Sequence, residues 1–378
     1  MGNYMHFVAP GVSYIASDAT WIESNAIQQL ITTAQLPGMT AVAGMPDLHP
    51  GRGYPVGAAF FSEGRFYPAL VGNDIGCGMA LYQTELKVSK LNADKAEKQL
   101  RSMHDHADAD WLAEHVSDHF ASHPFAASLS SVGGGNHFAE FQQIDKVCDD
   151  GLFAASGLDK HRVILLVHSG SRGLGQMILR HHVEQFSHDG LTENTPEAAE
   201  YLAAHQQALD FAQHNRALIA LRMMQQLRTN GEAILDINHN LVEACTVNGR
   251  NGWLHRKGAT PVDHDYVVIP GSRGDYSYLV KPHATADSLY SLAHGAGRKW
   301  MRTECKGRLS HRYTPAQLSR TDLGSRVICA NKQLIYEEAP QSYKSIETVI
   351  ESLSGAGLIT VVARLKPLLT YKTSGECC

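Results

Sequence analysis

A histidine lies beside two glycines and an arginine in the stretch His294-Gly-Ala-Gly-Arg298. Glycines leave backbone N–H groups free to approach phosphate oxygens, and the planar donors of arginine suit the same group. Histidine can accept a phosphorus centre covalently, because a reference pKa of about 6.5 leaves much of the imidazole unprotonated at neutral pH. A glycine-rich turn around a hydrogen-bonded structural histidine would read the same, so this stretch alone leaves both interpretations open.

A second group of residues has the chemistry of a metal site. Asp74-Ile-Gly-Cys77 places a carboxylate and a thiol in one glycine-rich segment, and His137, His168 and His239 each lie where an apolar segment meets a polar one. Each of these residues alone is more simply explained as part of a core. One carboxylate, one thiol and three imidazoles together indicate a two-metal set suited to Mn²⁺ or Zn²⁺. Paired ions are typical of phosphoryl transfer.

The whole-chain properties limit the kinds of partner. The chain has 378 residues, 43% of them hydrophobic, and a net charge of -5, so a nucleic acid would have to be held by a local basic patch. An ordinary solvated surface is the alternative explanation of that patch. The candidate cations are Arg256, Lys257, Arg298, Lys299, Arg302 and Lys306.

Several observations favour a cytoplasmic location. The chain opens without a basic segment followed by an apolar run, and it has no apolar stretch of about 18 residues. Its seven cysteines are scattered, and the adjacent Cys377 and Cys378 are not expected to form an ordinary bridge. This cysteine usage predicts a reducing compartment.

The elements that must position these residues are of mixed type. Apolar spacing and capping residues predict helices over 22–34, 92–103 and 196–227, and runs of Val and Ile predict strands over 162–167, 266–269, 326–330 and 359–365. Glycine-rich segments at 133–135, 170–175, 271–274 and 295–297 border such elements. This placement is typical of loops that converge on one polyanionic ligand. No composition break divides the chain, so we expect one site assembled from its whole length.

Taken together, the motifs resemble those of the RtcB-type RNA ligases, of which this chain would be a shorter and divergent member. The stretches that carry the resemblance follow the family's order and are 45–51, 72–78, 135–140, 168–175, 239–240, 255–260, 269–272, 294–298, 338–340 and 343–344. The resemblance implies a mixed α+β fold forming a single domain over residues 1–378. One departure is Arg273-Gly-Asp-Tyr276, which stands where a more apolar stretch containing threonine is common.

The resemblance also implies roles for individual residues. Asp74, Cys77, His137, His168 and His239 would bind two Mn²⁺ ions, with Cys77 touching both, and His294 would receive GMP from GTP. The residues matching the nucleotide-binding segments are Asn136, Phe138, Ala139, Glu140, Asn240, Pro270, Gly271, Ser272, Arg273, Ser277, Gly295, Ala296, Gly297 and Lys372, the last of them at the guanine.

The function implied by the resemblance is GTP-dependent RNA ligation in RNA repair, RNA splicing or tRNA processing. Such an enzyme joins RNA 3′-phosphate or 2′,3′-cyclic phosphate ends to 5′-hydroxyl ends through a histidine–GMP intermediate. One alternative is a metal-dependent phosphoesterase that opens cyclic phosphates without ligating, and another is a non-catalytic RNA-binding protein. The presence of both His294 and Lys372 favours ligation. The choice of RNA, the oligomeric state and the need for an accessory activator protein remain open at this stage.

Overall fold

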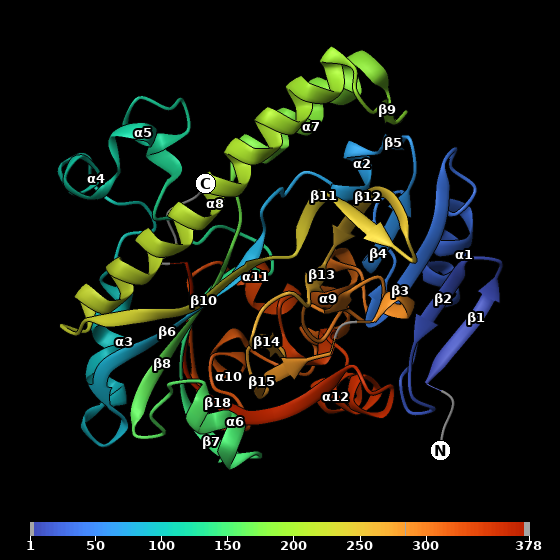
Figure 1. Ribbon diagram of the computed structural model, residues 1–378. Coiled ribbons are helices and arrows are strands. Elements are labelled where there is room, and N and C mark those ends of the chain that lie inside the picture. The colour runs from blue at the N-terminus through green and yellow to red at the C-terminus, as the bar shows by residue number, and fades with distance from the viewer. Residues whose placement is uncertain (1–3, 284, 374–378) are drawn as a thin grey trace.

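Two β-sheets and the helices packed on them make up the computed structural model, which describes residues 4–283 and 285–373 (Figure 1). The smaller of the two has six strands in the order β1-β2-β3-β4-β12-β11, and β2–β3 is its parallel pair. Its strands are β1 (Met5–Ala9), β2 (Val12–Ile15), β3 (Met39–His49), β4 (Val56–Ser62), β11 (Asn240–Val247) and β12 (Arg250–Lys257).

The larger sheet has eight strands in the order β10-β6-β8-β7-β18-β15-β14, with β17 parallel to β18. These strands are β6 (Gly78–Lys87), β7 (Phe138–Val147), β8 (Arg162–Ser169), β10 (Gly231–Asn238), β14 (Val267–Pro270), β15 (Ser277–Pro282), β17 (Arg326–Cys329) and β18 (Ile359–Thr373). Two further small sheets have two strands each: β13 (Ala259–Pro261) with β16 (Ser291–Ala293), and β5 (Arg65–Phe66) with β9 (Leu191–Thr192). The expected mixed α+β class is confirmed.

Strand β8 is apolar without interruption because both of its faces are covered. Val163, Leu165 and Val167 pack with Ile219 and Met223 of the long helix α8. The alternate residues Ile164 and Leu166 pack on the opposite face against residues of β14, β15 and β18. The apolar run that indicated a strand in the sequence is therefore the centre of two separate packed layers.

Helix α8 (Pro196–Gln226) crosses the molecule diagonally in Figure 1. The Thr195 side chain accepts the N–H of Ala198 and Pro196 occupies the first turn, a strong helix start. The remaining α-helices are α1 (Ser24–Thr33), α2 (Pro68–Val71), α3 (Ala93–Arg101), α4 (Ala109–His115), α5 (Asp118–Ala121), α6 (Asp150–Ala155), α7 (Gly173–Phe186), α9 (Arg302–Leu309), α10 (Pro315–Leu318), α11 (Lys332–Glu337) and α12 (Ile346–Gly355).

The predicted elements are confirmed with small differences at their ends. The three expected helices correspond to α1, α3 and α8, and the four expected strands to β8, β14, β17 and β18. Strand β18 runs on to Thr373, well beyond the predicted end at residue 365. Its pairing with β7 shifts register between Pro367 and Leu369, and this irregularity interrupts the alternation by which strands are recognised. No helix of residues 4–283 and 285–373 is long and apolar enough to cross a membrane. Cys377 and Cys378 lie outside the described residues.

Candidate active site

One cavity of about 530 Å³ gathers the residues singled out by their chemistry. Asp74 and Cys77 come from the turn between α2 and β6, and His137 directly precedes β7. His168 lies in β8, and His239 lies between β10 and β11. All five side chains line the cavity, as does His294, which follows β16. Segments that are far apart in the chain thus converge on one place.

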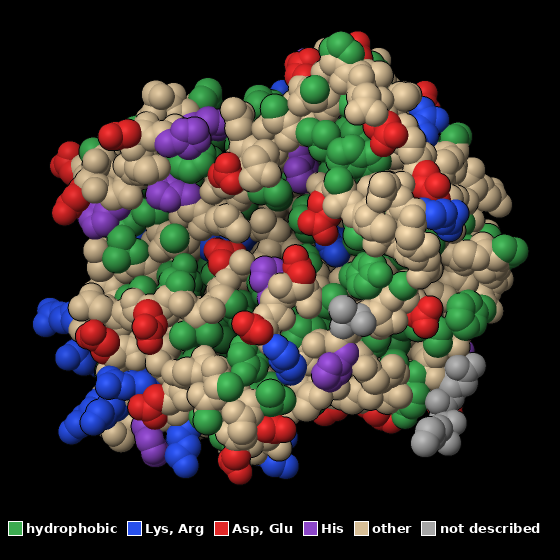
Figure 2. Space-filling model, viewed as in Figure 1, with side chains coloured by type: hydrophobic (Ala, Val, Ile, Leu, Met, Phe, Trp, Pro, Cys, Tyr) green, Lys and Arg blue, Asp and Glu red, His purple; other side chains and the backbone are tan. Residues whose placement is uncertain are grey.

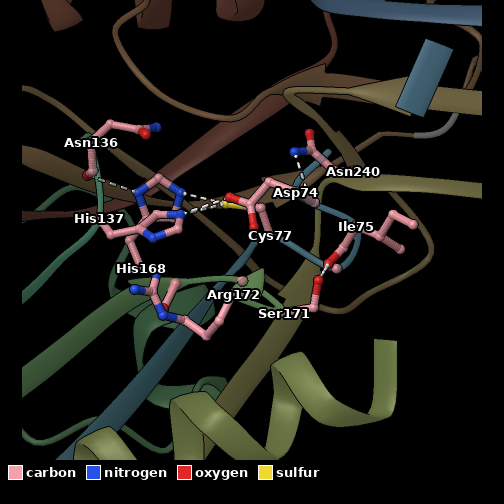
Figure 3. Close-up of polar contacts among 12 residues, drawn as sticks. Asp74, Ile75, Cys77, Asn136, His137, His168, Ser171, Arg172 and Asn240 are labelled. Carbon is pink, nitrogen blue, oxygen red and sulfur yellow. Dashed lines mark hydrogen bonds and ion pairs between the residues drawn. The ribbon is translucent and has the colours of Figure 1, made fainter. Parts of the chain in front are cut away.

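Cys77 is the centre of the candidate metal ligands (Figure 3). Its Sγ lies 3.3 Å from Nε2 of His137 and 3.1 Å from Nε2 of His168, and His137 Nε2 lies 2.8 Å from an Asp74 oxygen. Two groups of residues each place three ligand atoms within 4.8 Å of one another. The groups are Cys77–His168–His239 and Asp74–Cys77–His137. Cys77 belongs to both groups, which is the arrangement expected of a thiolate shared between two divalent ions.

The environment prepares these side chains to bind a cation. Burial lowers the pKa of His168 and of His239 well below the usual range, so both imidazoles keep a lone pair at neutral pH. Nδ1 of His168 bonds the carbonyl oxygen of Asn136 at 3.2 Å and leaves Nε2 facing Cys77. Burial and the neighbouring Asp74 raise the pKa of the Cys77 thiol. A bound metal would therefore have to displace the thiol proton. This set of nitrogen, oxygen and sulfur donors fits a divalent transition-metal ion.

His294 is held by a buried carboxylate. Its Nδ1 lies 2.6 Å from an Asp47 oxygen, and its backbone N–H donates to the same oxygen at 3.2 Å. Because a carboxylate accepts, Nδ1 is the ring nitrogen that donates in this contact, and Nε2 is not engaged by Asp47. A Cβ at Gly258 would come within 2.9 Å of the His294 ring, so a glycine is needed for this packing. Gly297 adopts a φ of 71° against the Asp47 backbone.

Lys344 holds the backbone on both sides of Asp47. Its ammonium donates to the carbonyl oxygens of Pro46 at 3.1 Å and Leu48 at 2.6 Å. Burial lowers the pKa of Lys344 to about 8, while the nearby Asp47 carboxylate acts in the opposite direction. The Lys344 ammonium thus lies near the buried Asp47 but bonds the neighbouring carbonyl oxygens. The Asp47 oxygen therefore keeps its bonds to His294.

A cluster of cations surrounds Glu338 at another part of the cavity wall. Arg298 lies 3.0 Å from a Glu338 oxygen, Arg302 lies 3.6 Å away and Lys372 lies 4.0 Å away. The two arginines face Oε1, whereas Lys372 and the Tyr343 hydroxyl, which donates a hydrogen bond, face Oε2. Burial by itself would raise the pKa of Glu338, but Lys372 and the two arginines outweigh it and hold the pKa below its usual value.

A single buried arginine of α8 links the segments that carry the metal-ligand candidates. Arg216 is fully buried. Its Nη1 donates to the carbonyl oxygens of Gly76 at 2.7 Å and Ser169 at 2.9 Å, and its Nη2 donates to the Asn238 side chain at 2.7 Å. These acceptors are the immediate neighbours of Cys77, His168 and His239 in the chain. Asp236 balances the guanidinium charge.

The structure brings most of the predicted nucleotide-binding residues together. Those that line the cavity are Asn136, Phe138, Asn240, Pro270, Gly271, Ser272, Arg273, Gly295, Ala296, Gly297 and Lys372. Ala139, Glu140 and Ser277 are buried and do not line it. The side chain of Gln142 donates to Glu140 at 2.7 Å and to Ser277 at 2.8 Å, so the last two belong to a polar layer behind the wall.

The candidate RNA-binding cations are divided between different environments. Lys257, Arg298 and Arg302 line the cavity, whereas Lys299 and Lys306 are exposed and do not line it. Arg256 is buried and ion-paired with Glu243.

Sequence reasoning left several functional residues out of the predicted site. Four of these residues lie in the stretches that carry the family resemblance, although the sequence assigned them no role. They are Asp47, Glu338, Tyr343 and Lys344. Arg216 lies inside the long predicted helix, where an isolated arginine is typical of a solvated surface, and it carried no such signal.

The chain is similar to known proteins over most of its length. The family model described as tRNA-splicing ligase RtcB matches residues 29–107 and 95–373. An RNA-splicing ligase RtcB2 from Escherichia coli is 63% identical over 375 residues, covering 99% of each chain. A tRNA-splicing ligase RtcB from Archaeoglobus fulgidus is 29% identical, covering 95% of this chain and 93% of the relative. One from Nanoarchaeum equitans is 30% identical, covering 87% of each.

Replacing Arg216 by Met should loosen the metal-ligand segments and destabilise the fold. Breaking a buried ion pair costs about 3–5 kcal/mol, and three backbone or side-chain acceptors would lose their donor. We expect a lower unfolding midpoint and, after dialysis against Mn²⁺ as the probe ion, less bound metal than in the wild type. Arg250→Met, which removes an exposed ion pair with Glu63, serves as the control and should change neither. Wild-type stability and metal content in Arg216→Met would contradict the assigned role.

Replacing Cys77 by Ser should weaken binding at both metal positions, because a neutral hydroxyl replaces an anionic sulfur at the atom shared by the two ligand groups. The bound Mn²⁺ per chain, measured after equilibrium dialysis, should fall at both sites. Cys245→Ser is the control, since that half-buried thiol lies outside the cavity lining. Two ions retained at unchanged affinity would show that Cys77 is structural.

Proposed function

The chain belongs to the RtcB family of RNA ligases, and we propose that it seals RNA ends by first transferring GMP from GTP to His294. The observation that carries this proposal is the Asp47–His294 pair beside the cluster of five metal-ligand candidates in one cavity. A nucleophile with a fixed tautomer next to a site for divalent cations is what nucleotidyl transfer requires. We further propose that residues 1–378 form a single ligase domain, because both sheets contribute to this cavity.

The first chemical step is attack by Nε2 of His294 on the α-phosphorus of GTP. An N–P bond forms, the bond from the α-phosphorus to the bridging oxygen breaks, and pyrophosphate leaves with the electron pair. The Asp47 carboxylate at 2.6 Å stabilises the positive charge that develops on the imidazole. Backbone N–H groups of residues 295–297 lie at the cavity wall, where they can face phosphate oxygens. Divalent ions, for which we propose Mn²⁺, would neutralise phosphate charge when held by the five metal-ligand candidates.

The later steps use the GMP carried by His294. An oxygen of the RNA 3′-phosphate attacks the phosphorus, the N–P bond breaks and the imidazole regains its lone pair. The 5′-hydroxyl of the second RNA end then attacks the activated 3′-phosphate and displaces GMP. A 2′,3′-cyclic phosphate end must be hydrolysed before this sequence can begin. An accessory activator protein is compatible with this scheme, and a reducing compartment such as the cytoplasm would preserve the Cys77 thiol.

A phosphoesterase that stops after opening cyclic phosphates is the alternative enzyme. That reaction needs the metal ligands but has no use for a nucleophilic histidine held by a buried carboxylate. Lys344 and Gly258 both constrain the Asp47–His294 pair, and this supports ligation.

RNA would be bound by a local surface. On the face shown in Figure 2, Lys and Arg side chains gather at the lower left, in the part of the view where Figure 1 labels α3 and β8. The candidate RNA-binding cations belong instead to β12, to α9 and to the segment before α9. Arg302 and Lys257 line the cavity, and the exposed Lys299 and Lys306 flank Arg302 in the sequence. We therefore propose that these four residues form the basic surface along which the RNA phosphates approach His294.

Replacing His294 by Ala should abolish covalent GMP transfer while preserving the metal site. Incubation with α-labelled GTP and Mn²⁺, followed by a denaturing gel, should label the wild type and leave the variant unlabelled. His283→Ala, which removes an exposed histidine bonded to Thr360, should label normally. Acid-labile labelling that persists in His294→Ala would refute the assignment.

Replacing Lys299 and Lys306 together by Gln should weaken RNA binding and flatten its dependence on salt. Each lost phosphate contact reduces the logarithmic salt slope for a single strand by about 0.7, so the pair should reduce it by about 1.4. Guanylylation of His294 should change little, because GTP is proposed to lie inside the cavity. The double variant Lys90→Gln/Lys95→Gln, made at exposed lysines outside the cavity lining, is the charge-matched control. An unchanged slope would identify Lys299 and Lys306 as an ordinary solvated surface.

A further inference from the structure

His49 is a histidine of the cavity wall for which the proposed steps have no use. It is the last residue of strand β3 and lines the cavity together with His294. Its Nδ1 lies 2.9 Å from the backbone carbonyl oxygen of Asp47, and because a carbonyl oxygen only accepts, Nδ1 donates. Nε2 makes no hydrogen bond to the described residues, and the half-buried ring leaves this atom accessible. One ring nitrogen is thus tied to the wall, and the other is available at the cavity.

The backbone is held on both sides of His49. Lys344 donates to the carbonyl oxygen of Leu48, the preceding residue, at 2.6 Å. The side chain of Gln29 accepts the N–H of Gly51 at 3.1 Å and donates to the carbonyl oxygen of the same residue at 2.9 Å. These bonds fix the point from which the imidazole projects, as is required of a group that must meet a reacting atom.

The surroundings keep this imidazole uncharged at neutral pH. Burial, together with the Lys344 cation, lowers the pKa of His49 to about 4, although the bond to the Asp47 carbonyl acts in the opposite direction. A neutral imidazole carries one ring proton, which here lies on Nδ1, so Nε2 holds a lone pair. His294 also acts electrostatically on His49. Phosphate anions bound in the cavity would raise the pKa of His49 again, which makes Nε2 a better proton acceptor once the substrates are in place.

Only some of the proposed steps need a proton acceptor. Guanylylation and the transfer of GMP to the RNA use an imidazole nitrogen and a phosphate oxygen, which attack with electron pairs that carry no proton. In the sealing step, by contrast, the 5′-hydroxyl must lose its proton as it attacks. Ionised phosphate groups present only acceptor oxygens, to which a neutral Nε2 has no proton to give. A hydroxyl is therefore the substrate group that this nitrogen suits.

On the basis of the proposed function, we propose that His49 is a catalytic residue of the sealing step, the general base that accepts the proton of the 5′-hydroxyl. The proton moves to Nε2 while the hydroxyl oxygen forms a bond to the phosphorus of the RNA 3′-phosphate. The bond from this phosphorus to the oxygen that bridges to GMP breaks, and GMP leaves with the electron pair. The imidazolium of His49 then returns the proton to solvent. His294, which has released GMP by this stage, is the competing proton acceptor.

Sealing can be measured alone with an RNA whose 3′-phosphate already carries GMP, mixed with a 5′-hydroxyl strand and Mn²⁺. This substrate also bypasses the opening of a cyclic phosphate, in which water loses a proton. His49→Asn keeps an amide near the place of Nδ1, and His49→Gln keeps one near the place of Nε2, but neither side chain is a base. Positioned general bases contribute about 10²–10⁴-fold, so both variants should seal at least about 100-fold more slowly than the wild type. Labelling of His294 from α-labelled GTP should be reduced far less, because no proton is removed in that step.

His6→Asn is the matched control. His6 is also a half-buried histidine of the smaller sheet, and one of its ring nitrogens lies 3.1 Å from the carbonyl oxygen of Ala16. It lies outside the cavity lining, so this variant should label and seal as the wild type does. Labelling of the His49 variants reports that their cavity is assembled, which separates the loss of a base from a folding defect.

The outcomes separate this inference from the proposed function. If the wild type takes up no label and does not seal the GMP-carrying RNA, the proposed function fails and the role of His49 fails with it. If the wild type seals and both variants seal at its rate, only the role of His49 is overturned, and His294 becomes the proton acceptor. A loss of labelling as large as the loss of sealing would also overturn the role and make His49 a support for the Asp47–His294 pair.

Discussion

The metal-ligand part of this cavity depends on one buried guanidinium. Arg216 bonds the segments next to Cys77, His168 and His239, which come from a turn, a strand and a loop that are distant in the chain. A buried ion pair rarely adds net stability, so its value here lies in fixing three segments relative to one another. The 31-residue helix α8 brings Arg216 there while its apolar side packs on the larger sheet. Asn215, next to Arg216, adds bonds to the same region by donating to Ser169 and to Gly170.

The proposed nucleophile, His294, is fixed at the wall of the same cavity by another buried polar contact. Asp47 is fully buried, and its two bonds to His294 come from the ring and the backbone of that residue. Lys344 constrains the chain on both sides of the carboxylate without competing for it. The two buried ionic centres, Arg216 with Asp236 and Lys344 near Asp47, therefore hold the candidate metal ligands and the proposed nucleophile at one cavity. The two groups adjoin, because the ring centroids of His239 and His294 lie 4.8 Å apart.

Much of the fold and most of the site could be read from the sequence, for physical reasons that also explain the omissions. Strand β8 and helix α8 have strong local patterns, and glycine-rich segments marked the loops that converge. The end of β18 was missed because Pro367 and a register shift break its alternation. Arg216 was missed because burial of an arginine is decided by acceptors from distant segments, which no local pattern records. The Asp47–His294 contact joins residues 247 positions apart, so only the folded chain could reveal it.

Strand β18 has a consequence for how the protein is made. It lies between β7 and β15 in the larger sheet, pairs also with β17, and contributes Lys372 to the cavity. Among the described elements it is the last to leave the ribosome, so the centre of the sheet stays open until β18 has been synthesised. Until then the facing edges of β7 and β15 are unpaired and can associate wrongly. Their partner is distant in sequence, a topology that favours slow folding. A nascent chain that stalls before residue 359 would therefore be an aggregation hazard whose cavity lacks Lys372.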